Sequence, residues 1–180
     1  MKKDKSPIER GLGFVADQTF QLKEELWANN LAENMPVVRP GRDIKELPKL
    51  NGSSAVVVGA GPSVERHGHL RLLKESGYGG TIIACDKILL PCLKVGVTPD
   101  IVISIDGAQV ISKFFDDPMI TENGKTKAAL NVITHPDTLA NVHCEKYFFM
   151  TTYDNPFEKK SITRIIHFMT RKTIMSSFGC

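Results

Sequence analysis

Five apolar segments, each followed by a stretch of helical character, dominate the chain from residue 52 onward. The segments are SAVVVG (54–59), TIIACD (81–86), DIVISID (100–106), AALNVIT (128–134) and KYFFMTT (146–152). Their apolar residues are mostly continuous, which is typical of strands covered on both faces of a sheet. Strands that alternate with helices are joined by right-handed crossovers and form a parallel sheet. The sequence therefore predicts an α/β fold with a Rossmann-like, doubly wound, mainly parallel sheet.

The first 51 residues have a different pattern. From Ser6 to about Asn34, apolar residues are scattered among charged ones, which predicts one or two helices. The stretch that follows contains Pro36, Pro40 and Pro48 and is typical of a connector with a short helical turn. We therefore expect a helical extension with a proline-rich connector over residues 1–51, and a nucleotide-binding domain over residues 52–180.

Composition and charge exclude several classes of protein. Hydrophobic residues make up 42% of the chain and charged residues 24%, as in soluble globular proteins. No apolar run approaches the roughly 18 residues of a membrane helix, and the basic start does not lead into a secretion signal. The net charge of +3 is too weak and scattered to indicate nucleic-acid binding. We expect a cytoplasmic protein without a membrane or nucleic-acid partner, and the sequence leaves a homo-oligomer open.

The first apolar segment runs into a glycine turn, Gly59-Ala60-Gly61-Pro62-Ser63, which precedes a helical stretch. In open parallel sheets, ligands bind beyond the carboxyl ends of the strands, and a strand-turn-helix unit presents backbone N–H groups to anions. These five residues are therefore candidates for nucleotide binding. Two alternatives stay open: a dinucleotide or flavin fingerprint, in which Val64 stands where glycine or alanine is usual, and a tight turn without a ligand.

Acidic residues end the second and third apolar segments. If the first three strands are neighbours, Asp86 and Asp106 face the glycine turn across one crevice. One or two carboxylates together with nucleotide phosphates are the usual ligands of Mg²⁺. Asp86 and Asp106 are thus candidate catalytic and metal-binding residues. The structural alternatives are that Asp86 caps a helix and that Asp106 shapes the turn at Gly107.

The fourth and fifth segments end in further polar residues that we expect at the same rim. These are Thr134, His135, Asp137, Tyr153, Asp154 and Asn155. Polar residues in loops are mostly only solvated, so we rank these six residues below the turn and the two acids.

The combination of VVVGAGPSV with IIACDKILLPCLKVGVTPDIVISID resembles the family of archaeal 6-hydroxymethylpterin diphosphokinases (MptE-like) and the flagellar motility accessory factors. The matching residues are Gly59, Gly61, Pro62, Ser63, Asp86, Gly96, Pro99, Asp100 and Asp106. This set is more specific than the glycine turn alone. It favours a nucleotide-phosphate turn of a transferase over a dinucleotide fingerprint.

The resemblance implies a nucleotide-dependent transferase with a nucleotide donor and a small-molecule or glycan acceptor. In the diphosphokinases ATP gives its pyrophosphate to a pterin alcohol, and in the accessory factors the donor is thought to be a CMP-activated nonulosonic sugar. A nucleotide- or flavin-binding module without catalysis is the third alternative. Family members usually continue with a further strand, whereas this sequence stops at TIMSSFGC, so we expect a domain truncated at its C-terminus.

Overall fold

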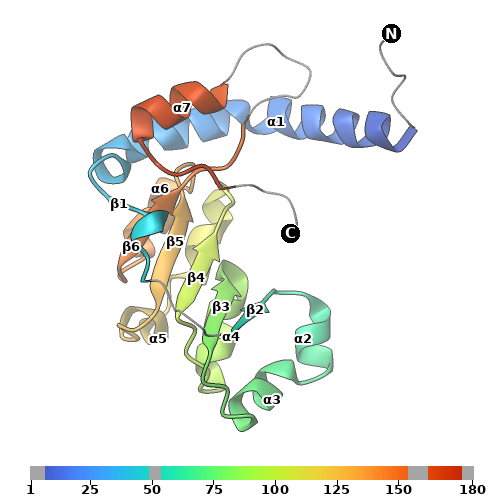
Figure 1. The fold of residues 1–180 in the computed structure, drawn as a ribbon, viewed down its shortest axis with the longest axis vertical. Coiled ribbons are helices and arrows are strands. Elements are labelled where there is room, and N and C mark those ends of the chain that lie inside the picture. Colours follow the sequence, from blue (N-terminus) through green and yellow to red (C-terminus); the bar gives the residue numbers. More distant parts are fainter. Residues whose placement is uncertain (1–6, 49–53, 154–161, 176–180) are drawn as a thin grey trace.

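A six-stranded, all-parallel sheet forms the centre of the protein (Figure 1). The computed structural model describes residues 7–48, 54–153 and 162–175, with side chains from residue 22 onward. The strands are β1 (Arg42–Asp43), β2 (Ala55–Val58), β3 (Thr81–Cys85), β4 (Ile101–Ser104), β5 (Lys127–Asn131) and β6 (Lys146–Phe149). Strands β2 to β6 coincide with the five apolar segments of the sequence. The predicted parallel α/β fold is confirmed.

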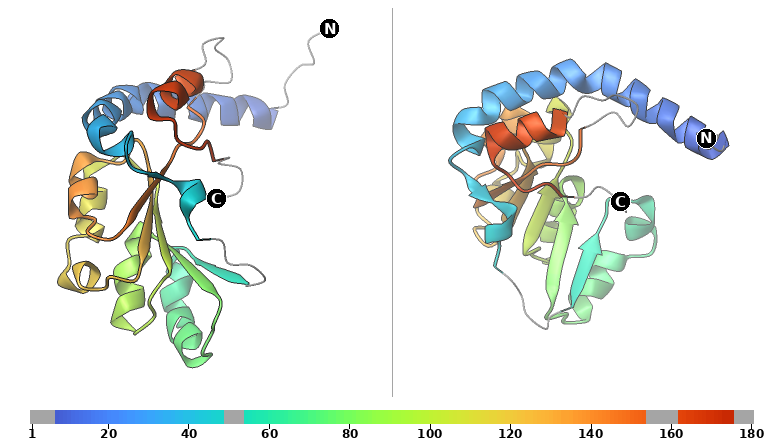
Figure 2. Two further views of the ribbon diagram at one scale, coloured as in Figure 1. Left: turned by 60° about the vertical axis from the view of Figure 1, so that its left-hand side comes forward. Right: turned by 45° about the horizontal axis from the view of Figure 1, so that its top comes forward.

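The strands β2 to β6 lie side by side in the order in which they occur along the chain, and β1 joins the outer side of β6. The helices between β2 and β6 all lie on one face of the sheet (Figure 2). Right-handed crossovers that advance in one direction place their helices on the same side, which explains this arrangement. The Rossmann-like architecture is thus confirmed. It differs from the doubly wound form in one respect: the strand order does not reverse between β2 and β6, so the helices that connect these strands cover one face of the sheet and not both.

The helices follow the predicted alternation. They are α1 (Pro7–Val38), α2 (Pro62–Arg66), α3 (His69–Glu75), α4 (Asp86–Lys94), α5 (Pro118–Thr121), α6 (Pro136–Asn141) and α7 (Ile162–Thr170), with 3₁₀ turns η1 (Ile44–Glu46) and η2 (Gln109–Phe114). The N-terminal helical region is one helix that continues through Pro36. A proline in the last turn removes only one backbone hydrogen bond, so the helix tolerates it there. The predicted connector holds the expected short helical turn, η1, and also β1, which belongs to the sheet.

Two apolar clusters fill the space between the sheet and its helices. The larger cluster contains Val102, Leu130 and Phe148 from the central strands. The smaller cluster joins Val58 and Ala84 from β2 and β3 to α4 and its neighbours. Burial of these side chains holds α4 against the sheet.

Helix α1 crosses the carboxyl-terminal ends of the central strands (Figure 1). Two buried asparagines, one helical turn apart, hold it there. The Asn30 side chain donates hydrogen bonds to the carbonyls of Gly107 (2.8 Å) and Ile133 (3.0 Å). The Asn34 side chain donates to Val132 (3.1 Å) and Thr134 (2.6 Å). Helix α1 therefore forms a roof over the edge where ligands of parallel sheets bind.

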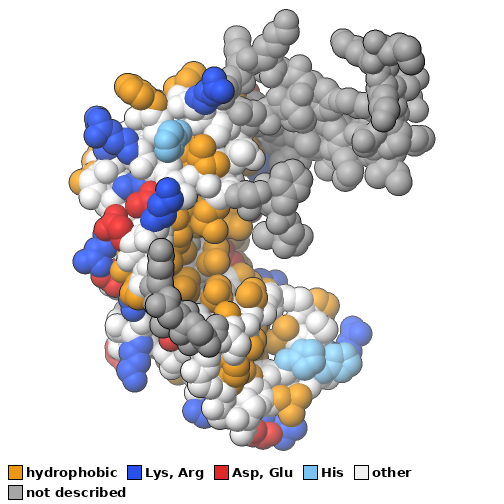
Figure 3. Space-filling view, in the orientation of Figure 1, with side chains coloured by type: hydrophobic (Ala, Val, Ile, Leu, Met, Phe, Trp, Pro, Cys, Tyr) orange, Lys and Arg blue, Asp and Glu red, His pale blue; other side chains and the backbone are white. Residues whose placement is uncertain are grey.

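The face of the sheet opposite α2 to α6 is open at its β2 end. Val57 on this face is 74% exposed, and Ile83, Ile101 and Ile103 are only partly covered. Figure 3 shows apolar side chains gathered along this face. The continuous apolar pattern of these strands predicted cover on both faces, whereas the described residues cover one face of β2 to β4. None of the described helices is long and apolar enough to cross a membrane.

Candidate functional site

The glycine turn, residues 59–63, links the end of β2 to α2. Gly61 is the N-cap residue of α2, with extended backbone (φ −70°, ψ 150°), and Pro62 occupies the first helical position. Proline suits this position because its fixed φ is helical and its missing N–H would have no partner there. Val64 packs against the smaller apolar cluster. The helix thus packs through a valine where the dinucleotide fingerprint requires glycine or alanine.

Neither glycine of the turn is required by the fold itself. Gly59 and Gly61 are absent from the residues with positive φ. A Cβ atom at Gly59 would meet nothing within 4 Å, and one at Gly61 would meet only the Ser63 hydroxyl, at 3.8 Å. By contrast, a Cβ at Gly107 would lie 2.7 Å from the carbonyl oxygen of Ile133. Packing therefore explains the glycine at 107, while the glycines at 59 and 61 leave the backbone open to a ligand.

A cleft of about 700 Å³ lies beside the turn, between the α2–α3 pair and α4. Residues 60–62 of the turn form part of its wall. The charged residues of its lining are Glu65, Arg71, Lys87 and Lys94. Three cations against one carboxylate favour an anionic ligand such as a phosphate chain. The sequence does not single out these cations, because lysine and arginine are common on any surface and only the fold brings them to the turn.

Asp86 is the first residue of α4, and Cys85 occupies the N-cap position. The interpretation of Asp86 as the helix cap is therefore wrong, because the chain becomes helical one residue earlier than a cap at Asp86 requires. One carboxylate oxygen accepts a hydrogen bond from the backbone N–H of Lys87 (2.7 Å), and the other accepts from the Ser104 hydroxyl (2.8 Å). Ser104 ends β4, so this bond joins the ends of β3 and β4.

Asp106 lies in the loop after β4 and partly shapes it. Its Oδ1 atom accepts a hydrogen bond from the backbone N–H of Ala108 (3.0 Å), as the turn-forming alternative expects. Lys23 of α1 also approaches Oδ1, at 3.4 Å. The Asp106 side chain is 45% exposed, and its Oδ2 atom makes no hydrogen bond to the described residues. One carboxylate oxygen of Asp106 is thus free to bind a ligand.

The turn, Asp86 and Asp106 follow three neighbouring strands. β2 pairs with β3 and β3 with β4, all parallel, so their carboxyl ends meet at one edge of the sheet. Within the described ranges, no three His, Cys, Asp or Glu side chains gather to hold a metal ion. Two carboxylates supplemented by phosphates and water do suit Mg²⁺, which seldom relies on protein ligands alone. The donor set therefore fits a magnesium–nucleotide complex, and the roles of these residues stay predictions.

The polar residues after β5 have mainly local roles. The His135 ring nitrogen Nδ1 accepts a hydrogen bond from the backbone of Asp137 at the start of α6 (3.2 Å). Asp137 accepts from the Gln109 side chain (2.8 Å), and Thr134 is fully buried under α1. Asp154 and Asn155 lie outside the described residues. Tyr153 lines a pocket.

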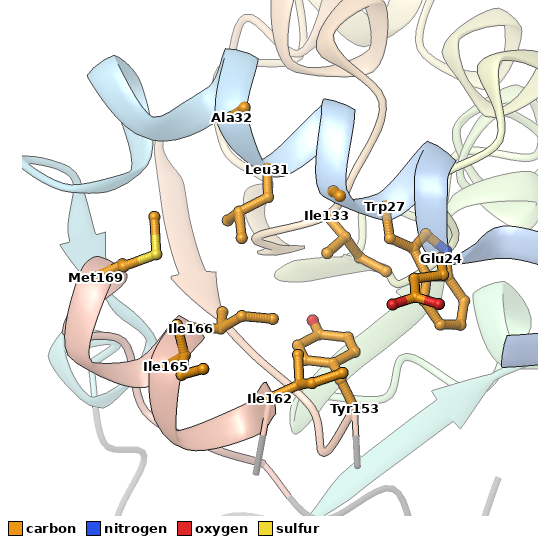
Figure 4. A pocket seen from close by; sticks show the side chains of 11 residues that line it. Glu24, Trp27, Leu31, Ala32, Ile133, Tyr153, Ile162, Ile165, Ile166 and Met169 are labelled. Atoms are coloured by element: carbon orange, nitrogen blue, oxygen red, sulfur yellow. The ribbon is translucent and has the colours of Figure 1, made fainter. Parts of the chain in front are cut away.

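That pocket lies between α1 and α7 (Figure 4). It has a volume of about 290 Å³ and is lined mainly by apolar side chains. Its lining includes the side chains of Glu24, Trp27, Leu31, Ile133, Tyr153 and Ile166. No local sequence pattern predicts this pocket, because its two walls come from helices more than a hundred residues apart in the chain.

A sequence profile of the 6-hydroxymethylpterin diphosphokinase MptE-like family matches residues 29–174. The chain belongs to this family. The match begins within α1 and ends after α7, so it includes the whole sheet, the glycine turn, Asp86 and Asp106. No protein with a curated description matches the chain. The MptE-like family therefore supports the resemblance seen in the sequence, and Lys23, Glu24 and Trp27 lie before the matched region.

Proposed function

We propose that this protein is a nucleotide-dependent transferase that moves the diphosphate group of ATP to the alcohol of 6-hydroxymethylpterin. The observation that carries the proposal is the open glycine turn beside a cationic cleft, in a chain of the MptE-like family. The glycines at 59 and 61 have no role in packing or backbone strain. A ligand that approaches the backbone closely gives them one.

In this proposal, the turn and the cleft hold the phosphates of the donor. Backbone groups of residues 59–63 lie at the start of α2, where an anion is favoured. Lys87 lies in the first turn of α4 and lines the same cleft, so its ammonium group is a candidate to neutralise phosphate. Arg71 and Lys94 contribute further positive charge along the cleft. This arrangement holds a phosphate chain without a P-loop.

Asp86 and Asp106 would hold Mg²⁺, which would neutralise charge on the phosphates as they react. The reaction joins the pterin hydroxyl oxygen to the β-phosphorus of ATP, and the bond from that phosphorus to the α,β-bridging oxygen breaks. AMP leaves with the electron pair, and the hydroxyl proton passes to a carboxylate or to water. The residues contribute alignment and charge rather than a covalent intermediate, as is usual in phosphoryl transfer.

The test is an assay of product formation by the purified protein with ATP, Mg²⁺ and 6-hydroxymethylpterin. The proposal expects AMP and pterin diphosphate in equal amounts, and no product without Mg²⁺. A parallel reaction contains a CMP-activated nonulosonate and a protein acceptor. Release of CMP there, without AMP in the first reaction, would replace the proposal with the glycosyltransferase alternative. Tight nucleotide binding without either product would favour a non-catalytic module.

A further inference from the structure

We infer that the pocket between α1 and α7 binds the ring of the acceptor, a planar 2-amino-4-oxopteridine, and that Glu24 recognises its amino edge. The inference rests on the proposed function and assigns the acceptor a place in the molecule. The profile match begins after Glu24 and Trp27, so family membership does not itself assign these residues a role.

The size and lining of the pocket suit a small aromatic ring system. Its volume of about 290 Å³ lies at the lower end for ligand pockets, which favours a bicyclic ring over a complete nucleotide. Trp27 and Tyr153 stand with their ring centroids 6.1 Å apart and their planes inclined by 54°. Aliphatic side chains of Ile133 and Ile166 complete the walls. Flat apolar and aromatic walls hold a heterocycle by contact with its faces.

Glu24 supplies the hydrogen-bonding specificity. It is the one charged residue among the described residues that line the pocket. Figure 4 shows its carboxylate beside the Trp27 ring, at the same end of the pocket as Tyr153. The amino group and the adjacent ring N–H of a pterin point in parallel, so they can donate two hydrogen bonds to one carboxylate. Such paired, charge-assisted bonds fix orientation and add affinity.

The base of the pocket is already ordered. The Tyr153 hydroxyl donates a hydrogen bond to the buried side-chain oxygen of Asn131. The backbone N–H of Tyr153 donates to the Thr163 hydroxyl of α7 (2.9 Å). These bonds tie the ring of Tyr153 both to β5 and to the helix that forms the opposite wall. A ligand would therefore meet a wall that needs little reorganisation.

The pocket lies next to Asp106, beyond the glycine turn and Asp86. Lys23, which contacts Asp106, precedes Glu24 in α1. The Trp27 ring would lie 3.2 Å from a Cβ atom at Gly107, so it packs directly on the loop after β4. The pocket residues Ile133 and Tyr153 follow β5 and β6, whereas Asp106 follows β4, and Asp86 and the glycine turn follow β3 and β2. A ring in the pocket therefore lies on one side of Asp106, with Asp86 and the glycine turn on the other. The two carboxylates lie between donor and acceptor, as transfer between them requires.

The experiment uses the intrinsic fluorescence of Trp27, the sole tryptophan of the chain. The full chain is titrated with 6-hydroxymethylpterin, with and without Mg²⁺ and a non-hydrolysable ATP analogue. Quenching of Trp27 with sensitised pterin emission reports a ring bound near Trp27, and the variants below test whether it lies in the pocket. A second titration uses the analogue with oxygen in place of the 2-amino group, which cannot donate to Glu24 from that position.

Two variants with matched controls test the geometry. Glu24→Gln should weaken pterin binding about tenfold or more and reduce the preference for pterin over the oxygen analogue. Glu25→Gln changes the same charge on the neighbouring residue, outside the pocket, and should bind like the parent. Ala28→Phe fills the pocket from α1 and should abolish binding, whereas Asn29→Phe places the ring outside the lining and should not.

The outcomes separate this inference from the proposed function. If AMP forms but Glu24→Gln and Ala28→Phe bind pterin like the parent, the pocket assignment is overturned and the transferase function stands. If the variants behave as expected but AMP never forms, the pocket stands and the transferase function fails. Absence of pterin binding under both nucleotide conditions overturns the pocket assignment.

Discussion

At the scale of single residues, a substitution at Gly61 tests whether the glycine turn binds a ligand or is only structural. Its backbone is extended with negative φ, and a Cβ atom there meets nothing closer than 3.8 Å. Gly61→Val should therefore fold with a melting temperature close to that of the parent. It should lose nucleotide binding, because the side chain occupies the space that a phosphate must enter. Thermal shift with and without ATP measures both effects.

Gly107→Ala provides the contrasting variant. Its Cβ would lie 2.7 Å from the Ile133 carbonyl oxygen and 2.9 Å from the Asn30 amide. The loop or α1 must then move, so we expect a loss of stability on the order of 1–3 kcal/mol. If Gly61→Val is the more destabilising of the two and still binds nucleotide, the turn is structural.

The carboxylates can be tested through their dependence on Mg²⁺. Asp106→Asn retains a side-chain oxygen for the hydrogen bond from Ala108 but removes the charge that a divalent cation requires. It should weaken the magnesium-dependent part of ATP affinity and leave the magnesium-free part unchanged. Asp86→Asn, which retains an acceptor for Ser104, should behave in the same way. Calorimetric titration of ATP with and without Mg²⁺ gives both affinities.

Asp116→Asn serves as the control, since Asp116 is exposed and lies away from the strand ends. Should both variants at 86 and 106 bind magnesium–ATP as tightly as the parent, the two acids must be interpreted as structural residues. Their hydrogen bonds to Ser104, Lys87 and Ala108 would then be their whole role.

At the scale of elements, the stability of the roof depends on how α1 is held. Asn34 is buried and donates to two carbonyl groups, of Val132 and Thr134. Asn34→Ala leaves both without that partner in a dry environment, so we expect a loss of about 2 kcal/mol in the free energy of unfolding. Urea denaturation measures it. Asn29→Ala, on the exposed side of the same helix, should change stability little, and equal effects of the two would mean that α1 is not held through Asn34.

The elements that the sequence predicted well are those with strong local signals. Five strands were identified because continuous Val, Ile and Ala runs are interrupted by helical stretches, and both periodicities are local properties. Strand β1 was missed because its two residues, Arg42 and Asp43, carry no apolar signal and pair with β6 only through the fold. The continuation of α1 through Pro36 was also missed, because tertiary hydrogen bonds from Asn34 stabilise a turn that local propensity disfavours.

The part of the candidate site that follows the first three apolar strands could be predicted from the sequence. The order of the strand ends follows from chain connectivity, so the neighbourhood of the turn, Asp86 and Asp106 could be anticipated. The cations of the cleft and the pocket at Trp27 could not. Each depends on which helices meet, such as α3 with α4 or α1 with α7, and no local pattern encodes that pairing.

At the scale of the whole molecule, the segment that follows α1 meets the segment that follows α7 beside β6. Asp43 of β1 accepts hydrogen bonds from the backbone N–H (2.7 Å) and hydroxyl (2.6 Å) of Thr173, 130 residues away. Lys172 is buried and donates to the carbonyl of Gly41. Met150 after β6 bonds the same segment through the carbonyl of Thr173 (3.0 Å). The segment after α7 is thus joined to the strand that follows α1.

This contact makes stability depend on the ionisation of Asp43. Burial alone would raise the pKa of its carboxyl group, but the hydrogen bonds from Thr173 and Lys45 and the charge of Lys172 outweigh burial and hold the pKa below its usual value of 3.8. A group whose pKa is lowered on folding stabilises the folded state above its unfolded pKa. That stabilisation is lost as the pH falls through the folded pKa.

Asp43→Asn should therefore lower the melting temperature by a few degrees at pH 7, because it removes the charge that Lys172 and Thr173 stabilise. As the pH falls below 3.8, first the unfolded and then the folded carboxyl takes up a proton, so the difference between parent and variant should shrink. Thermal unfolding of both proteins across this range measures the difference, with Asp116→Asn as the exposed control. A difference that stays constant from pH 7 to pH 3 would mean that Asp43 acts through packing rather than through its charge. In that case the junction between β1 and the segment after α7 would not respond to pH.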